Sequence, residues 1–271
     1  MTLEVFRQKK MRPLRLLQIT DCHLGSTPGE MLLGLDTDQS LYDVLECLRA
    51  QESPDIIVAT GDMSNDGGVP SYERFIDIVT QFFPSVPLAW LPGNHDDPMS
   101  MDQVRNLPIE AHHKIGGWNI ILLDSRIPME EGGDLNDVEL ARLDRELAAN
   151  PDMPTVVFLH HQPVPVGSAW VDQYVVKSAD RFFEIIDRHD NVKAVSWGHV
   201  HQEFVGKHND IPLLATPSTC IQFTPNKKDF KVDTAMPGYR LFELFPDGTL
   251  HTTIRRIEDK VYSIDFASTG Y

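Results

Sequence analysis

The sequence predicts a layered α/β fold, and three observations lead to this prediction. Six nearly continuous apolar, β-branched runs recur over residues 14–201, and each ends in polar residues. Four segments between these runs carry apolar residues at helical spacing. After residue 201, strand-like runs follow one another with hairpin-type links. Alternation of strands and helices is typical of layered α/β proteins, and the closing runs indicate a more antiparallel second half.

The six runs are predicted to be strands buried on both faces, because their apolar character is nearly continuous. They are LRLLQITD (14–21), DIIVATGD (55–62), VPLAWLPGNHD (86–96), WNIILLDS (118–125), TVVFLHHQP (155–163) and VKAVSWGHVH (192–201). Three further strands are expected in IPLLATP (211–217), GYRLFELF (238–245) and LHTTIRRI (250–257). The intervening PDG at 246–248 predicts a hairpin between the last two.

Four helices are predicted from apolar stripes whose members recur at three- and four-residue spacing. The stripes are Leu41, Val44, Leu45 and Leu48; Tyr72, Phe75, Ile76 and Val79; Leu140, Leu143 and Leu147; and Phe182, Phe183, Ile185 and Ile186. The chain has no repeat of fixed period, no low-complexity tract and no obvious linker. We therefore expect residues 1–271 to form one domain, with the functional motifs in 21–201 and further strands and a substrate cap in 202–271.

The net charge is −16 and the calculated pI about 5.0. Such an acidic surface argues against binding to nucleic acid or to an anionic membrane. Any phosphate site therefore needs local positive charge from bound cations. The three cysteines, Cys22, Cys47 and Cys220, match no zinc or redox spacing, which favours reduced thiols and a cytoplasmic location. We expect no signal peptide and no transmembrane helix, since the apolar stretches are strand-sized.

Side chains that bind metals follow five of the predicted strands. They are Asp21 and His23, Asp62, Asn94 and His95, His160 and His161, and His199 and His201. Because sites in open α/β sheets form outside the carboxyl ends of the strands, we expect these side chains to lie close together. Carboxylate and imidazole ligands suit Fe, Mn, Co or Zn, whereas Ca²⁺ prefers oxygen ligands alone and structural zinc more often uses thiolates.

The candidate ligands outnumber the positions around one tetrahedral ion, which favours two ions about 3.5–4 Å apart with one bridging carboxylate. Asp62 is the natural bridge because it has no neighbouring ligand on its own strand end. The pair His199 and His201 is expected to share one face of an extended backbone. An isolated pair of this kind is more often structural than ligating; the agreement of five strand ends favours ligation. Glycines at 61, 93 and 198 would permit tight turns and close approach of the backbone.

The remaining histidines serve as a comparison set, because none of them ends a buried apolar strand. His112, His113, His189, His208 and His251 are predicted to be surface or loop residues. Cys22 should point away from its two neighbours and pack in the core. His161 has two interpretations: it supports a ligand through hydrogen bonds, or it contacts the substrate.

The motifs D-x-H, GD, GNHD, HH-x-P and GHxH occur in this order between residues 21 and 201, and they resemble those of the calcineurin-like metallophosphoesterases. This resemblance implies a four-layer α/β/β/α sandwich of two mixed sheets flanked by helices, with the later antiparallel strands in the second sheet. It also implies one metal held by Asp21, His23, Asp62 and His201, and another held by Asp62, Asn94, His160 and His199. His95 would contact the phosphate and act near the leaving group.

Three segments outside the metal motifs resemble the bacterial class III cyclic nucleotide phosphodiesterases. They are HHQPVPVGSAWVD (160–172), TPSTCIQFTPNKKDF (216–230) and PGYRLFELFPDGTLHTTIRRI (237–257). The resemblance implies hydrolysis of 3′,5′-cyclic AMP to 5′-AMP with two divalent ions, Fe²⁺ or Mn²⁺ first and Zn²⁺ or Co²⁺ as alternatives. One departure is Gln162, where many relatives carry proline.

In this interpretation a metal-bridging hydroxide attacks phosphorus, while Asn94, His95 and Asp62 form the catalytic set. We expect the substrate to lie against His23, Asp62, Asn94, His95 and His201, with His161, Trp170 and Phe223 as candidates for holding the base. Two alternatives stay open: another phosphodiesterase or phosphatase, acting on glycerophosphodiesters or many substrates, and a non-catalytic scaffold. The sequence also leaves open the native metal, cyclic AMP against cyclic GMP, and the oligomeric state.

Overall fold

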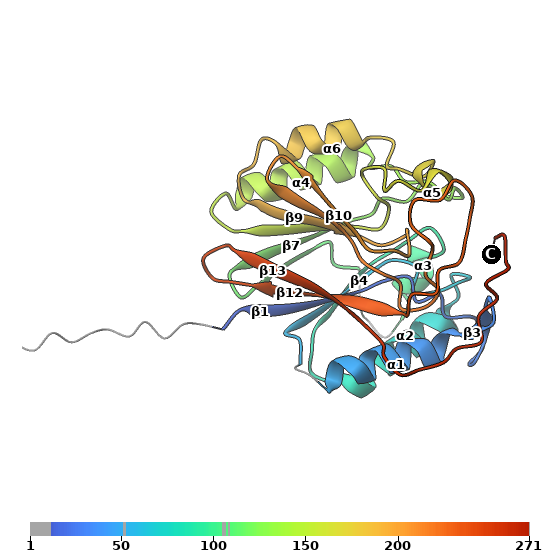
Figure 1. Ribbon diagram of the computed structural model, residues 1–271. Coiled ribbons are helices and arrows are strands. Elements are labelled where there is room, and N and C mark those ends of the chain that lie inside the picture. The colour runs from blue at the N-terminus through green and yellow to red at the C-terminus, as the bar shows by residue number, and fades with distance from the viewer. Residues whose placement is uncertain (1–11, 51–52, 105–106, 108, 271) are drawn as a thin grey trace, which may run out of the picture.

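The computed structural model describes residues 12–50, 53–104, 107 and 109–270, and the described elements form four layers (Figure 1). Two β-sheets lie face to face in the middle, with one group of helices outside each sheet. This arrangement is the predicted α/β/β/α sandwich. Among the described helices, none is long and apolar enough to cross a membrane.

The first sheet has five strands in the order β13-β12-β1-β4-β5. β1, β4 and β5 run parallel, while β12 pairs antiparallel with β1 and β13 pairs antiparallel with β12. The bounds are β1 (Leu14–Ile19), β4 (Ile56–Thr60), β5 (Leu88–Leu91), β12 (Gly238–Leu244) and β13 (Leu250–Arg256). The predicted hairpin therefore joins β12 to β13.

The second sheet has six strands in the order β10-β11-β9-β8-β7-β6. β7, β8, β9 and β11 run parallel, and the two edge strands β6 and β10 are antiparallel to their neighbours. The bounds are β6 (His112–Ile115), β7 (Trp118–Leu123), β8 (Thr155–Leu159), β9 (Val192–Trp197), β10 (Phe204–His208) and β11 (Ile211–Ala215). A small separate hairpin pairs β2 (Met31–Leu32) with β3 (Leu35–Asp36).

The predicted helical stripes face the sheets. α1 (Thr37–Arg49), α2 (Val69–Phe82) and the short α3 (Pro98–Met101) cover the first sheet, and α4 (Asp137–Ala149) and α6 (Ala179–Ile186) cover the second. α5 (Ala169–Asp172) is a single turn near the end of the second sheet. Asp36 caps α1 by accepting a hydrogen bond from the Gln39 amide, which satisfies one of the free amides of the first turn.

Three apolar cores separate the four layers. One lies between α1, α2 and the first sheet, and another between α4, α6 and the second sheet. The third fills the space between the two sheets, where Trp118, Phe158 and Phe242 are fully buried. The rings of Phe158 and Phe242 meet edge to face with centroids 5.8 Å apart, which fixes the two sheets against each other.

One expectation about the strands is wrong. The later antiparallel strands do not all belong to the second sheet, because β12 and β13 extend the first sheet beside β1. Phe242 and Leu244 of β12 are buried between the sheets, so this placement completes the central core. His112 and His113 in the edge strand β6, His208 in the edge strand β10 and His251 in the edge strand β13 are partly or fully exposed, as predicted, and none of them ends a buried strand. Edge strands expose one side, so they lack the apolar run that predicted the others.

Candidate metal centre

The candidate ligands lie just beyond the carboxyl ends of β1, β4, β5, β8 and β9, at one end of the sandwich. Five of them have backbone φ angles between 45° and 63°: Asp21, His23, Asp62, His199 and His201. This left-handed region is rarely occupied by residues other than glycine and is often found at functional sites. The sequence predicted that His199 and His201 share one face of an extended strand. This prediction is wrong, because β9 already ends at Trp197.

Asp21, His23 and His201 form the first group of converging side chains. The Nε2 atoms of His23 and His201 are 3.1 Å apart, and Oδ1 of Asp21 lies 3.4 Å from Nε2 of His201. Nδ1 of His201 donates to the carbonyl of Ile221 at 2.7 Å, so the lone pair of this ring is on Nε2, toward the group. The carboxylate of Asp21 also accepts the backbone N–H of His199 at 3.0 Å, which ties the turn after β9 to the turn after β1.

Asp62, Asn94 and His160 form a second group beside the first. Nε2 of His160 lies 3.2 Å from Oδ2 of Asp62 and 3.1 Å from Oδ1 of Asn94. Nδ1 of His160 donates to the carbonyl of Thr60 at 2.8 Å, which directs Nε2 toward the group. The same Oδ2 of Asp62 lies 3.7 Å from Nε2 of His23, so this carboxylate stands between the two groups.

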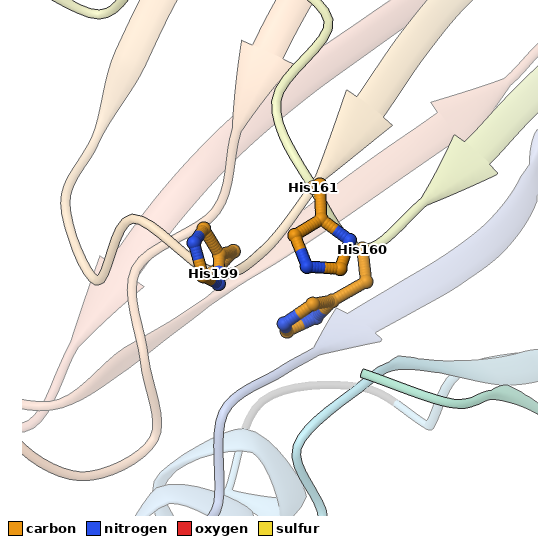
Figure 2. A group of neighbouring side chains, drawn as sticks. All are labelled: His160, His161 and His199. Carbon is orange, nitrogen blue, oxygen red and sulfur yellow. The ribbon is translucent and has the colours of Figure 1, made fainter. Parts of the chain in front are cut away.

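Figure 2 shows His199 with its ring facing the rings of His160 and His161 across one shared space. The ring centroid of His199 is 5.1 Å from that of His160 and 4.7 Å from that of His161. Nε2 of His199 is buried and has no hydrogen-bond partner among the described residues. A buried nitrogen without a partner is costly unless something else satisfies it, and a cation in this space would do so.

Glycines allow these side chains to approach so closely. Gly61 has a φ of +98°, and a Cβ atom there would overlap the imidazole of His160. A Cβ atom on Gly93 would overlap the carboxylate of Asp62. Both glycines are thus required by close approach, as the sequence predicted, and Gly61 also by its backbone conformation.

The electrostatics of the centre keep Asp62 ionised and the rings of His23 and His199 neutral, whereas His160 must release a proton when a metal binds. Burial opposes the charge on Asp62, but the neighbouring His160 and His95 hold its pKa well below the usual range. Burial lowers the pKa of His23 to about 3 and that of His199 well below its ordinary value, so both rings are neutral. For His160 burial also lowers the pKa, yet the charge and hydrogen bond of Asp62 raise it to about 9. Neutral imidazoles and ionised carboxylates are the forms that bind divalent metals.

His95 lies beside both groups and is partly exposed. Its Nδ1 donates to the carbonyl of Asn65 at 3.1 Å, and its backbone N–H donates to Oδ1 of Asp62 at 2.9 Å. Its ring meets that of His23 edge to face at 4.8 Å. The side chain is therefore fixed at the border between the buried ligands and solvent.

A cavity of about 210 Å³ opens next to His95 and His199. Its lining residues are Asn94, His95, Glu131, Trp170, Val171, Tyr174, His199, Phe223, Phe230 and Gly270. The rings of Trp170, Phe223 and Phe230 pack edge to face, each pair with centroids 5.1 Å apart. A larger depression of about 700 Å³ lies between α1 and β13, but it contains none of the candidate ligands, so the smaller cavity is the candidate substrate site.

Sequence reasoning named Trp170 and Phe223 for this cavity but missed Phe230, Tyr174 and Glu131. The hydroxyl of Tyr174 donates to the carboxylate of Glu131 at 2.5 Å, and this bond, followed by burial, raises the pKa of Tyr174 to about 12. These residues come from three separate loops, and no local pattern marks them. Phe230 could have been predicted from family resemblance, because it is the last residue of segment 216–230, which resembles the cyclic nucleotide phosphodiesterases.

His161 and Gln162 follow β8, and neither is among the residues that line the cavity. His161 is fully buried, and its two ring nitrogens have partners in Ser125 Oγ at 2.9 Å and the Glu131 carbonyl at 3.2 Å. Gln162 donates from Nε2 to the carbonyl of Val171 at 2.7 Å, which links the end of β8 to α5.

Cys22, as expected, packs in the core between the first sheet and its helices.

The chain is similar to known proteins both in sequence and in fold. The model of the calcineurin-like phosphoesterase family matches residues 14–203. The chain is 39% identical over 259 residues to the 3′,5′-cyclic adenosine monophosphate phosphodiesterase CpdA of Pseudomonas aeruginosa, covering 94% of each chain. It is 40% identical over 263 residues to the enzyme of the same name from Escherichia coli K12, covering 95% of each. Among solved structures, a dimetal phosphatase from Danio rerio superposes with a TM-score of 0.68 at 14% identity, covering 93% of this chain and 99% of that one, and thus shares the fold.

Proposed function

This chain belongs to the calcineurin-like phosphoesterase family, and on that premise we propose that it hydrolyses the phosphodiester of 3′,5′-cyclic AMP to 5′-AMP. The main support for this proposal is the position of the candidate metal ligands next to the aromatic cavity. Seven carboxylate, amide and imidazole side chains converge at one end of the sandwich, directly beside an aromatic cavity. Relatives that align over 94–95% of the chain are named as cyclic AMP phosphodiesterases, which supports the choice of substrate.

We assign two divalent cations to this centre, with Fe²⁺ or Mn²⁺ preferred and Zn²⁺ or Co²⁺ as alternatives. Asp21, His23, Asp62 and His201 would hold one, and Asp62, Asn94, His160 and His199 would hold the other. When bound, such ions supply Lewis acidity and an activated water for attack on phosphorus. The fit rests on the unpartnered Nε2 of His199 and on the Nε2 atoms that His160 and His201 direct toward the centre.

The side chains of the protein would orient the phosphate and move one proton. Asn94 belongs to the second ligand group and also lines the cavity, where its amide N–H can donate to a phosphate oxygen. His95 lines the same cavity, and its bond to the Asn65 carbonyl fixes the proton on Nδ1. Proton exchange with the departing 3′ oxygen would then pass through Nε2 of His95. His23, Asp62 and His201 would lie beneath the phosphate.

The aromatic part of the cavity would hold the nucleoside. Trp170 and Phe230 offer apolar faces and edges of the kind that stack on bases. Phe223 also lines the cavity, but it is 1% exposed and stacks on the ring of His201 with centroids 4.2 Å apart, so it would support the other two rings from below. For His161 we propose the supporting role, because its ring is buried and both nitrogens already bond to the protein. Ser125 and the Glu131 carbonyl would keep this ring packed against the ligands His160 and His199.

We further propose that residues 1–271 act as one domain, in which 202–271 help to enclose the substrate. The three cysteines are free thiols, which supports a reducing compartment such as the cytoplasm. The net charge of −16 supports a small nucleotide as the partner rather than nucleic acid or a membrane.

Kinetics on metal-reconstituted protein test the proposal. We expect about two metal ions per chain and the highest kcat/KM for cyclic AMP among cyclic AMP, cyclic GMP, 2′,3′-cyclic AMP, a glycerophosphodiester and a phosphomonoester. A much higher kcat/KM for the glycerophosphodiester would make the protein a different phosphodiesterase of the same family. A protein that binds no metal and shows no turnover in added Mn²⁺ or Fe²⁺ would instead be a non-catalytic scaffold.

A further inference from the structure

The last described segment of the chain, residues 258–270, crosses the molecule and ends at the cavity. We call this segment the C-terminal strap. It leaves β13, passes along α1 and the β2–β3 hairpin, and reaches the side of the molecule where α5 lies (Figure 1). Gly270, near its end, is one of the residues that line the cavity. A segment without regular structure thus connects the outer helical layer to the candidate substrate site.

A buried carboxylate of α1 holds the first half of the strap. Asp43 is 4% exposed, and it accepts hydrogen bonds from Lys260 Nζ at 2.9 Å and from Tyr262 Oη at 2.7 Å. Hydrogen bonds to a buried charged acceptor are stronger than those between neutral groups, so these two contacts fix the course of the strap.

The turn between β2 and β3 holds the second half. Gly34 has a φ of +84°, and a Cβ atom there would lie only 2.8 Å from the carbonyl oxygen of Ser263. The amide of Asp265 donates to the carbonyl of Leu33 at 2.8 Å. Tyr262 and Ile264 also pack on the apolar cluster that contains Phe223. The strap is therefore seated on the same cluster that forms the aromatic side of the cavity.

We propose that the C-terminal strap is the outer wall of the nucleoside pocket and that it limits substrates to single nucleotides. The inference rests on the proposed function and adds a determinant of substrate size that lies far from the metal ligands in sequence. With the strap in place the cavity is about 210 Å³. This volume is below the roughly 300–1,000 Å³ of ordinary ligand pockets and suits one base rather than two. A loosened strap would admit a linear dinucleotide, whereas a bulkier strap would exclude even one base.

The first test fills the pocket from the strap. A Cβ atom at Gly270 meets no atom within 4 Å, so Gly270→Trp is expected to fold normally and to place its indole at the cavity mouth. We expect KM for cyclic AMP to rise about tenfold, while kcat/KM for the compact diester methyl 4-nitrophenyl phosphate stays unchanged. Ala267→Trp is the matched control, because Ala267 is exposed on the strap but does not line the cavity.

The second test loosens the strap. Lys260→Met with Tyr262→Phe removes both bonds to Asp43 while keeping most of the apolar packing. We expect the ratio of kcat/KM for the linear dinucleotide ApA to that for cyclic AMP to rise about tenfold. The control is Arg181→Met, which removes an exposed ion pair with Asp137 on the opposite helical layer. The strap inference is overturned if both variants match wild type on cyclic AMP and ApA.

Binding of 5′-AMP to the metal-loaded protein, measured by calorimetry, separates this inference from the proposed function. If wild type hydrolyses no diester but binds 5′-AMP, and Gly270→Trp weakens that binding about tenfold, the proposed reaction is wrong and the wall is supported. If wild type neither turns over diesters nor binds 5′-AMP, both proposals fail. If wild type hydrolyses cyclic AMP and Gly270→Trp binds 5′-AMP as tightly as wild type, the proposal that the strap forms the pocket wall is wrong and the proposed function stands.

Discussion

The Nε2 atoms of His23 and His201 face each other at 3.1 Å on side chains that are almost completely buried. The Nδ1 proton of His201 is committed to the Ile221 carbonyl, so the lone pair of this ring faces His23. Burial keeps the ring of His23 neutral, with a pKa of about 3. The carboxylate of Asp21 adds negative charge 3.4 Å from His201. Without a metal, Nε2 of the neutral His23 ring can donate to Nε2 of His201. A cation bound there would take the place of that proton and contact both nitrogens and the carboxylate.

Metal removal should therefore destabilise the protein. A ligand that binds only the folded state at 100 times its Kd adds about 2.7 kcal/mol, and in a chain of this size that corresponds to a rise in Tm of about 5–10 °C. Differential scanning calorimetry of chelator-treated protein with and without Mn²⁺ measures this shift. Mg²⁺ at the same concentration is the control, because it favours oxygen ligands. Equal Tm values in all three conditions would argue against a metal centre.

Metal affinity should depend on pH through His160. Its pKa is about 9 in the metal-free protein, because the adjacent Asp62 outweighs the effect of burial. The ring must lose a proton to bind a metal, so below pH 9 each bound ion at this position displaces about one proton. The Kd for Mn²⁺ should fall about tenfold per pH unit between pH 6 and 8. Calorimetry in buffers of different ionisation enthalpy counts the protons, and a count near zero would contradict the pKa.

Asp62→Ala should remove the carboxylate that stands between the two ligand groups. Its Oδ2 lies 3.2 Å from His160 and 3.7 Å from His23, so both groups lose a partner. We expect kcat/KM to fall by more than about 100-fold and the metal content to fall below two ions per chain. Asp36→Ala is the control, because it removes the α1 cap at about 1 kcal/mol of stability and should leave turnover unchanged. Full activity with both metals retained would refute the bridging role.

His95→Ala should separate chemistry from metal binding. The side chain lines the cavity and is partly exposed, and its Nδ1 is held by Asn65 rather than by a ligand. We expect kcat to fall about 100-fold, as for loss of a general acid, with metal content close to wild type. His113→Ala, in the edge strand β6, should change neither quantity. Loss of metal from His95→Ala would instead make His95 a ligand.

The sequence predicted the layered fold and the side chains that converge, because strand ends in α/β proteins have a recognisable polar signature. It did not predict the left-handed backbone at His199 and His201, since periodicity carries no information about φ beyond a strand end. It also failed to assign β12 to the first sheet, because antiparallel partners are chosen by packing across the core. Tyr174 and Glu131 were missed for a similar reason: they meet only through the folding of distant loops.

The aromatic cavity supplies the last prediction, in which Phe230→Leu weakens nucleotide binding without affecting the metals. Phe230 packs edge to face on Trp170 and Phe223, and it lines the cavity rather than the metal centre. Leucine keeps apolar volume but loses the flat ring, and stacking on a base is worth about 1–3 kcal/mol. KM for cyclic AMP should therefore rise about fivefold or more, with kcat for methyl 4-nitrophenyl phosphate unchanged.

Phe183→Leu is the matched control, because this ring stacks on His208 at the outer helical layer, away from the cavity. Steady-state kinetics of both variants on both substrates decide the matter. If Phe230→Leu impairs the two diesters equally, the ring supports the fold of the cap rather than the base. If it impairs neither, the nucleoside lies elsewhere and Trp170 loses its proposed role as well, since the two rings form one wall.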